Sequence, residues 1–145
     1  MATTYATNNA EETISLGEKL AASLKSGDVV ALCGGLGAGK TVFAKGVAKG
    51  LGVDEEVTSP TYTLLKQYMG SRLPLCHFDL YRIEDEQELE YIGFYDFLGG
   101  ENVCLIEWAQ NAGNINPNIK VQISGKGNDT RVIKIYEEKD AYTGG

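Results

Sequence analysis

The stretch from Gly34 to Thr41 (GGLGAGKT) carries the clearest chemical signal in the sequence. Gly34, four further residues and then Gly39-Lys40-Thr41 satisfy the full P-loop pattern, with an apolar run before the loop and helical spacing after it. Glycines let consecutive backbone N–H groups converge on phosphate oxygens, and the start of the next helix adds unpaired N–H groups and a positive dipole end. This stretch therefore predicts a site for the phosphates of a nucleotide.

Two side chains of the loop have predicted roles of their own. Lys40 would reach the β and γ phosphates, and Thr41 would place its hydroxyl on Mg²⁺, a hard ion that takes oxygen ligands. A dinucleotide fingerprint is excluded, because with Gly35 and Gly37 as its first two glycines the third would fall on Lys40. The pattern indicates a triphosphate bound together with magnesium.

Two carboxylates at strand ends are candidates to complete this site, because ligands of open α/β sheets collect outside the carboxyl ends of the strands. Glu107 follows the apolar residues 103–106, which is a Walker B position, and we predict that it binds Mg²⁺ or positions water. Asp79 either lies near the loop or simply caps its strand. We interpret His77 as structural, since phosphoryl transfer depends on positioning more than on imidazole chemistry.

Two other polar segments have weaker signals. The segment SPTYT, residues 59–63, offers hydroxyls after a proline-stiffened turn, and it either senses a γ phosphate or forms a hydroxyl-rich turn. Lys45 and Lys49 stand one helical turn apart, which is typical of a solvated helix face rather than a binding site.

The elements that must position these residues alternate along the chain. Helical spacing predicts helices over residues 10–27, 40–51 and 84–98. Apolar runs predict strands between and after them, over residues 28–33, 73–82 and 102–108. Residues 57–68 mix turn residues with a later β-rich run, and 119–124 with 130–137 predict an antiparallel hairpin. Only the ends, with Asn8-Asn9 and residues 143–145, are expected to be frayed. The order predicts an α/β fold of three layers, with a mainly parallel sheet and a C-terminal antiparallel hairpin.

Length, charge and cysteine content limit the possible functions. The 145 residues fit one domain, and a formal net charge of −7 opposes a broad nucleic-acid surface, so any RNA contact is expected to pass through a partner. No apolar run approaches the roughly 18 residues of a membrane span and no leader is apparent, so we expect a cytoplasmic protein without membrane contact. Cys33, Cys76 and Cys104 are predicted to be reduced, buried thiols.

Four motifs occur in an order and spacing more specific than a glycine loop alone: LGAGKT (36–41), VTSPTYTLL (57–65), HFDLYR (77–82) and LIEW (105–108). Through them the sequence resembles, over nearly its whole length, the TsaE (YjeE) family of small bacterial P-loop ATPases. Members of that family are needed for the threonylcarbamoyladenosine (t6A) modification of tRNA at adenosine 37. They act with the TsaB and TsaD proteins, and their ATP binding and hydrolysis reset that complex between rounds.

The resemblance implies a Mg²⁺-dependent P-loop ATPase, spanning residues 1–145, that is weak alone and depends on its partners. The implied catalytic residues are Lys40, Asp79 and Glu107, and the implied metal ligands are Thr41 and Glu107. Most members have aspartate where this chain has Gly35, which affects loop rigidity and turnover rather than the phosphate cradle. The implied nucleotide contacts are Thr13, Gly35, Leu36, Gly37, Ala38, Gly39, Lys40, Thr41, Thr61, Trp108 and Arg131.

Two other functions are compatible with the loop. A small-molecule kinase could transfer the γ phosphate, but it needs positive side chains around the phosphoryl group, and the chain has only Arg72, Arg82 and Arg131. A scaffold without turnover would use bound ATP only to order residues 59–63 for a partner.

Overall fold

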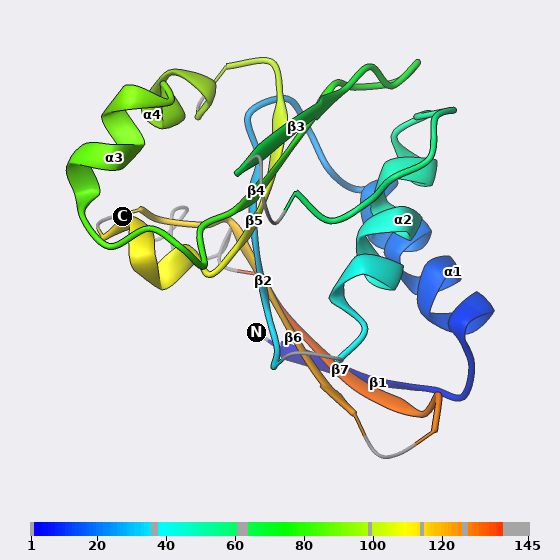
Figure 1. Cartoon of the computed structure of the whole chain (residues 1–145). Helices are drawn as coiled ribbons and strands as arrows, with labels where there is room; N and C mark the ends of the chain where they lie inside the picture. The colour runs from blue at the N-terminus through cyan, green and yellow to red at the C-terminus, as the bar shows by residue number, and fades with distance from the viewer. Residues whose placement is uncertain are drawn as a thin grey trace, which may run out of the picture.

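A computed structural model describes residues 2–35, 38–60, 64–98, 100–113, 115–125 and 128–137 of the chain. Within these residues a seven-stranded sheet carries helices on both faces (Figure 1). The strands are β1 (Ala2–Thr7), β2 (Val29–Cys33), β3 (Leu65–Tyr68), β4 (Leu75–Asp79), β5 (Val103–Glu107), β6 (Ile119–Gly125) and β7 (Arg131–Glu137). The helices are α1 (Ala10–Ala21), α2 (Lys40–Gly50), α3 (Glu86–Tyr91), α4 (Phe94–Phe97) and the 3₁₀ turn η1 (Ala109–Ala112).

The sheet has the strand order β1-β7-β6-β2-β5-β4-β3. Its four central strands, β6, β2, β5 and β4, are parallel, whereas β3 pairs antiparallel with β4, and β7 pairs antiparallel with both β6 and β1. Helices cover both faces, so β2, β4 and β5 are almost wholly buried. Strand β2 is apolar throughout and β5 is apolar up to Glu107, whereas β4 includes the polar residues His77 and Asp79. The predicted three-layer α/β fold and the C-terminal hairpin are confirmed.

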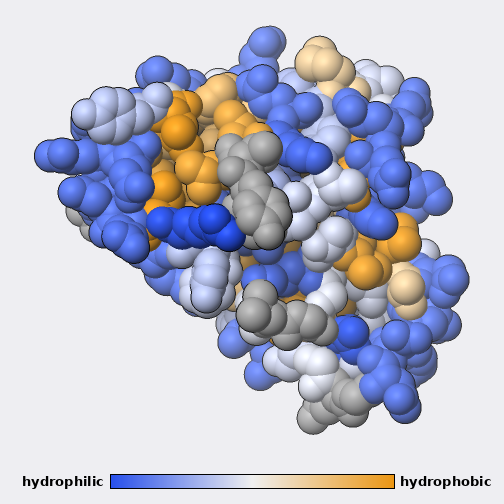
Figure 2. Space-filling model, viewed as in Figure 1, coloured by the Kyte–Doolittle hydropathy of each residue, from blue (hydrophilic) through white to orange (hydrophobic). Residues whose placement is uncertain are grey.

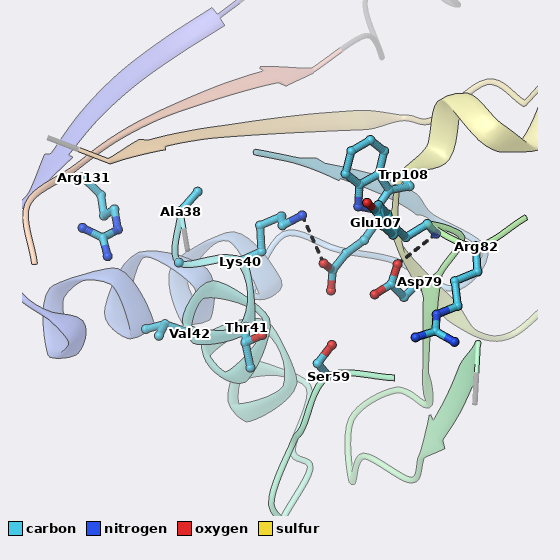
Figure 3. Close-up of a pocket in the computed structure, with 12 residues that line it drawn as sticks. Ala38, Lys40, Thr41, Val42, Ser59, Asp79, Arg82, Glu107, Trp108 and Arg131 are labelled. Atoms are coloured by element: carbon cyan, nitrogen blue, oxygen red, sulfur yellow. Dashed lines mark hydrogen bonds and ion pairs between the residues drawn. The ribbon is translucent and has the colours of Figure 1, made fainter. Parts of the chain in front are cut away.

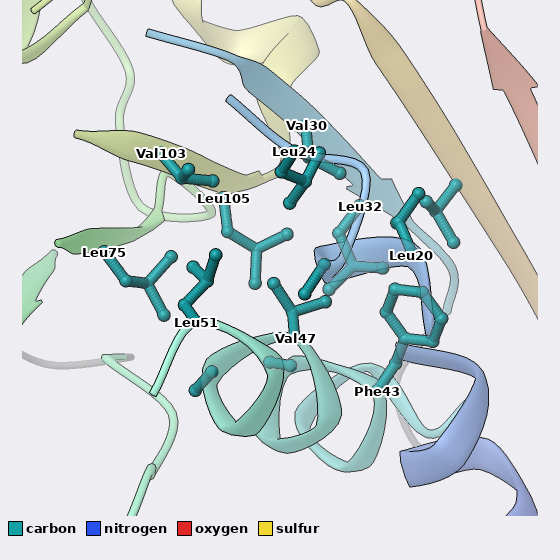
Figure 4. Packing of buried hydrophobic residues seen from close by; sticks show 14 of the residues in the cluster. Leu20, Leu24, Val30, Leu32, Phe43, Val47, Leu51, Leu75, Val103 and Leu105 are labelled. Atoms are coloured by element: carbon teal, nitrogen blue, oxygen red, sulfur yellow. The ribbon is translucent and has the colours of Figure 1, made fainter. Parts of the chain in front are cut away.

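The larger core lies between the sheet and the pair α1 and α2 (Figure 4). Leu32 and Leu105 project from the sheet towards Val47 and Phe43 of α2, all of them buried. The two helices cross closely because a glycine stands at the crossing. A Cβ atom added to Gly46 would lie 2.1 Å from the carbonyl oxygen of Ile14.

A second core packs α3, α4 and η1 on the opposite face of the sheet. Phe78 of β4 stacks edge-on against Phe94, with ring centroids 4.8 Å apart, and Phe97 completes the cluster. This packing holds α4 against β4. The outer surface over α3 and α4 is largely hydrophilic, beside a smaller apolar area (Figure 2).

The predicted helix boundaries were wrong in two places. The helix predicted over 10–27 ends at Ala21, where the chain turns and the guanidinium of Arg72 donates to three backbone carbonyls at and just beyond the helix end. The helix predicted over 84–98 is interrupted by Gly93 in a left-handed conformation (φ 72°), which leaves the two short helices α3 and α4. Asp85 begins α3 with a complete capping box.

The expected frayed N-terminus was also wrong. Residues 2–7 form an edge strand, and the Asn9 side chain caps α1 by accepting the backbone N–H of Glu12 at 2.8 Å. Residues 143–145 lie outside the described residues. All three cysteines are free, but only Cys76 and Cys104 are buried, since Cys33 ends β2 beside an open hollow at the glycine loop. Within the described residues, no helix has the length and apolar character to cross a membrane.

Candidate functional site

The glycine loop joins the end of β2 to the start of α2, and Lys40 is the first residue of that helix. Gly39 has a left-handed conformation (φ 101°), and a Cβ atom there would lie 3.0 Å from Nε of Arg131, so glycine suits both the turn and the close approach. Among the described residues no side chain caps this helix, so its first backbone N–H groups are available to a ligand. Leu36 and Gly37 lie outside the described residues.

A cleft of about 480 Å³ opens in front of this loop (Figure 3). The first turn of α2 forms one wall, with Lys40 and Thr41, and the carboxyl ends of β4 and β5 form the opposite wall, with Asp79 and Glu107. Arg131, from the start of β7, lies at the far end of the cleft. The fold therefore brings together Lys40 and Thr41, Asp79 and Glu107 from three separate motifs, and it adds Arg131 from a fourth part of the chain.

Lys40 and Glu107 face each other across the cleft. Nζ of Lys40 lies 3.5 Å from Oε1 of Glu107, and the two residues are only 8% and 4% exposed. The other oxygen, Oε2, lies 2.8 Å from Nε2 of His77 on β4. Burial raises the pKa of Glu107, but His77 and Lys40 together outweigh this effect and hold the pKa below its ordinary value. Glu107 is thus ionised at neutral pH and accepts the hydrogen bond from His77.

Asp79 stands directly beside Glu107, because the two are register partners on the parallel strands β4 and β5. Asp79 is 7% exposed, and its Oδ1 accepts the backbone N–H of Tyr81 at 3.0 Å. The sequence left two alternatives for this residue, a place near the loop or a strand cap. The geometry combines them, since one carboxylate both ends the strand and lines the cleft.

Trp108 follows Glu107 in a left-handed conformation (φ 59°, ψ 43°) that is uncommon for a residue with a side chain. This backbone turns its ring back over the cleft, where the centroid lies 5.4 Å from Nζ of Lys40. The ring also packs against that of Tyr81, with centroids 4.8 Å apart. In this structure Lys40 is therefore held by a carboxylate on one side and an aromatic face on the other.

The donor atoms of the cleft fit a magnesium ion. The hydroxyl of Thr41 and the carboxylates of Asp79 and Glu107 line the same space, and hard oxygen donors are what Mg²⁺ takes. Among the described residues, no three His, Cys, Asp or Glu side chains lie close enough to hold a metal by themselves. The usual magnesium site of a nucleotide enzyme has one or two carboxylates, with the other positions filled by phosphates and water.

The other predicted contacts lie at different distances from the cleft. Ala38, like Gly39 and Arg131, lines it, and Gly35 is exposed beside it. Thr13 instead lies buried on α1, where its hydroxyl is 2.8 Å from that of Thr7, and it is not part of the cleft wall. Thr61 lies outside the described residues.

Sequence reasoning missed the contact between His77 and Glu107. The available signal was the alternation of β4, which puts His77 on the same face as Asp79. Tyr81 also lines the cleft, although the sequence assigned it no role. Ser59 lines it too, as the first residue of the segment 59–63 for which we considered γ-phosphate sensing, and so does Arg82, one of the chain's arginines.

A wider, shallower groove of about 650 Å³ runs between β1 and α1. Its charged side chains are the carboxylates of Glu11 and Glu12 and the single amine of Lys19, so it does not favour the phosphates of a nucleotide. The cleft at the glycine loop is therefore the better candidate site.

Comparisons with known proteins agree with the motifs. A family model described as threonylcarbamoyl adenosine biosynthesis protein TsaE matches residues 7–133. The TsaE protein of Bacillus subtilis is 46% identical over 131 residues, which cover 89% of this chain and 82% of that protein. The TsaE protein of Treponema pallidum is 44% identical over 116 residues, covering 80% and 85% of the two chains.

Among solved structures, the crystal structure of Bacillus subtilis YdiB superimposes with a TM-score of 0.82 at 36% sequence identity. The match covers 99% of this chain and 90% of that one. The chain therefore belongs to the TsaE family and has its P-loop fold.

Proposed function

We propose that this protein is the ATP-binding and ATP-hydrolysing subunit needed for t6A modification of tRNA at adenosine 37. It would act in the cytoplasm as a single domain together with the TsaB–TsaD pair. The observation that carries the proposal is the meeting of Lys40 and Glu107, 3.5 Å apart, at the free N-terminus of α2. A glycine loop, its lysine and a strand-end carboxylate are the parts that phosphoryl transfer needs in one place.

Each residue of the cleft has a role in this proposal. The free N–H groups of α2 bind the phosphates, and Lys40 leaves Glu107 to neutralise their charge. Thr41 and Glu107 hold Mg²⁺, which when bound stabilises the negative charge of the transferring phosphoryl group. Asp79 supports the arrangement from the next strand, and its backbone partner Tyr81 keeps the strand end in place.

The remaining predicted contacts would hold the rest of the nucleotide. Arg131 lies at the far end of the cleft from Glu107, where it can meet parts of ATP beyond the γ phosphate. We propose nucleotide contacts for Trp108 and Thr61 as well, because both belong to the family motifs. A contact for Thr13, which is buried away from the cleft wall, is proposed from the family resemblance alone.

The distribution of charge supports a contact with tRNA through partner proteins. Residues 83–101 contain seven acidic residues and neither lysine nor arginine. The formal charge of this segment therefore equals the net charge of the whole chain, −7. The rest of the chain balances its acidic residues with 13 basic ones. A molecule with this distribution has no excess of positive charge to offer a polyanion, whereas it can dock on proteins.

Phosphate release from ATP tests the proposal, measured with Mg²⁺ for this chain alone and then with a cognate TsaB–TsaD pair. We expect slow turnover alone and strong stimulation by the pair. Lys40→Ala should abolish both turnover and tRNA modification, while Lys45→Ala, on the exposed side of the same helix, should leave them unchanged.

Three outcomes would contradict parts of the proposal. Full tRNA modification by Lys40→Ala would refute the P-loop account. Fast turnover that ignores the pair would favour a small-molecule kinase, and a search for phosphate acceptors would follow. Normal tRNA modification without any hydrolysis in Glu107→Ala would favour a scaffold that only needs bound nucleotide.

A further inference from the structure

His77 is wholly buried within β4, yet it is not satisfied as a buried polar residue usually is. Its Nε2 bonds Glu107, whereas Nδ1 has no hydrogen-bond partner among the described residues. A buried polar atom without a partner costs stability that an apolar side chain of similar size would not cost. Packing alone therefore does not account for a histidine here, and the bond to Glu107 is the feature that needs this side chain.

The two oxygens of Glu107 have partners of different kinds. Oε2 is bonded to His77, which is fixed inside the sheet, and Oε1 faces Lys40, which the proposed function moves to the phosphates. When Lys40 leaves, His77 is the one side-chain partner of Glu107 that stays among the described residues. Without it, a buried carboxylate would keep neither a fixed orientation nor a donor to offset its burial.

We propose that His77 is a positioning residue: it holds Glu107 by Oε2, so that Oε1 alone is exchanged between Lys40 and Mg²⁺. The proposal rests on the proposed function, because it assumes that Glu107 meets a metal. It gives a role in the site to a residue for which the sequence predicted only a structural one, and it assigns separate roles to the two oxygens of one carboxylate.

Two polar substitutions separate this role from a structural one. The amide of His77→Gln can place an N–H group where Nε2 stands, while the shorter amide of His77→Asn cannot reach Glu107. Binding of a non-hydrolysable ATP analogue is measured by calorimetry in EDTA, and the Mg²⁺ affinity of the resulting complex is then titrated. We expect all three proteins to bind the analogue alike in EDTA.

Magnesium affinity should distinguish the variants. His77→Asn should weaken it by about 10-fold or more, the effect typical of losing a group that orients a metal ligand, and His77→Gln should restore most of it. The kcat for ATP should fall in parallel while KM changes little. Cys76→Ala, an equally buried neighbour on the opposite face of β4, is the control for damage to the core.

A measurement on the unmodified protein keeps the proposal testable if a variant fails to fold. His77 is the single histidine of the chain, so its ring ¹⁵N signals need no assignment by mutation. We expect Nε2 to carry a proton in the free protein and in the complex of the ATP analogue with Mg²⁺. An unprotonated Nε2 in that complex would overturn the proposal, because such a ring cannot donate to Glu107.

The possible failures are distinguishable. If the unmodified protein binds Mg²⁺–nucleotide and His77→Asn binds it equally well, the role of His77 is wrong and the proposed function stands. Equal losses in His77→Asn and His77→Gln would also refute positioning through Nε2. If the unmodified protein shows no magnesium-dependent nucleotide binding, the proposed function and the role of His77 fail together.

Discussion

Replacing Glu107 by glutamine should strengthen nucleotide binding when magnesium is absent. Before a nucleotide can use Lys40, it must draw Nζ away from Oε1 of Glu107, 3.5 Å distant. The attraction between unit charges at that distance is about 5 kcal/mol at an effective dielectric constant of about 20, which is an upper limit for this competition. Glutamine has nearly the same shape and no charge. The side chain of Lys40 could then move to the phosphates without first overcoming this attraction.

The measurable gain is smaller than the upper limit, since Lys40 is partly solvated by the open cleft when it is released. A net worth of about 1.5–3 kcal/mol is usual for a hydrogen-bonded contact that involves a charge, which corresponds to roughly 10- to 100-fold tighter binding. Magnesium should remove or reverse this gain, because the same substitution deletes a proposed metal ligand. Hydrolysis should fall under all conditions.

Calorimetry with a non-hydrolysable ATP analogue, in EDTA and then in excess Mg²⁺, checks the change of sign. Asp79→Asn is the matched control, because it removes a neighbouring carboxylate from the cleft but leaves the pair of Lys40 and Glu107 intact. It should produce a smaller gain in EDTA, due only to reduced repulsion of the phosphates. If Glu107→Gln binds the analogue in EDTA no more tightly than Asp79→Asn does, the contact between Lys40 and Glu107 does not compete with phosphate.

Two further predictions concern stability. Gly46→Ala should lower the urea midpoint of unfolding, because the added Cβ would lie 2.1 Å from the carbonyl oxygen of Ile14. The overpacking should cost about 1–3 kcal/mol of stability, which exceeds the gain of roughly 1 kcal/mol in helix propensity. The control variant Lys45→Ala, on the exposed face of α2, should change the midpoint little. A Gly46→Ala protein as stable as the original would refute the close crossing of α1 and α2. Arg72→Ala should lower the melting temperature, because its guanidinium donates to three carbonyls at the end of α1. The loss of these bonds should cost about 1–2 kcal/mol, which Arg72→Lys should only partly recover, and an unchanged melting temperature would show that α1 ends without this cap.

The centre of the site was predictable because its signals are local. A glycine loop between an apolar run and helical spacing identifies itself over a few residues, and Glu107 ends a continuous apolar strand. The contacts around Glu107 were not predictable, because they depend on register. Only the pairing of β4 with β5 puts Asp79 beside Glu107 and lets His77 reach its carboxylate.

The wrong predictions about the fold have a common cause: the local sequence pattern is weak or misleading at those positions. Strand β1 has a mostly exposed sequence at the edge of the sheet, so it lacks the apolar alternation that marks a half-buried strand. The spacing over 84–98 suits one helix throughout, and only the left-handed Gly93 divides it. The end of α1 depends on Arg72, a residue far away along the chain.

The pairing of the first described strand with the last has a consequence for synthesis on the ribosome. Of the described elements β1 is made first, but its neighbour in the sheet is β7, so among the described strands β1 has none to pair with until β7, the last of them, is made. The same late strand carries Arg131 into the cleft, opposite Thr7 in the register. A nascent chain thus exposes its glycine loop before the wall that holds Arg131 is made, and we expect the complete cleft to form only once β7 has joined the sheet.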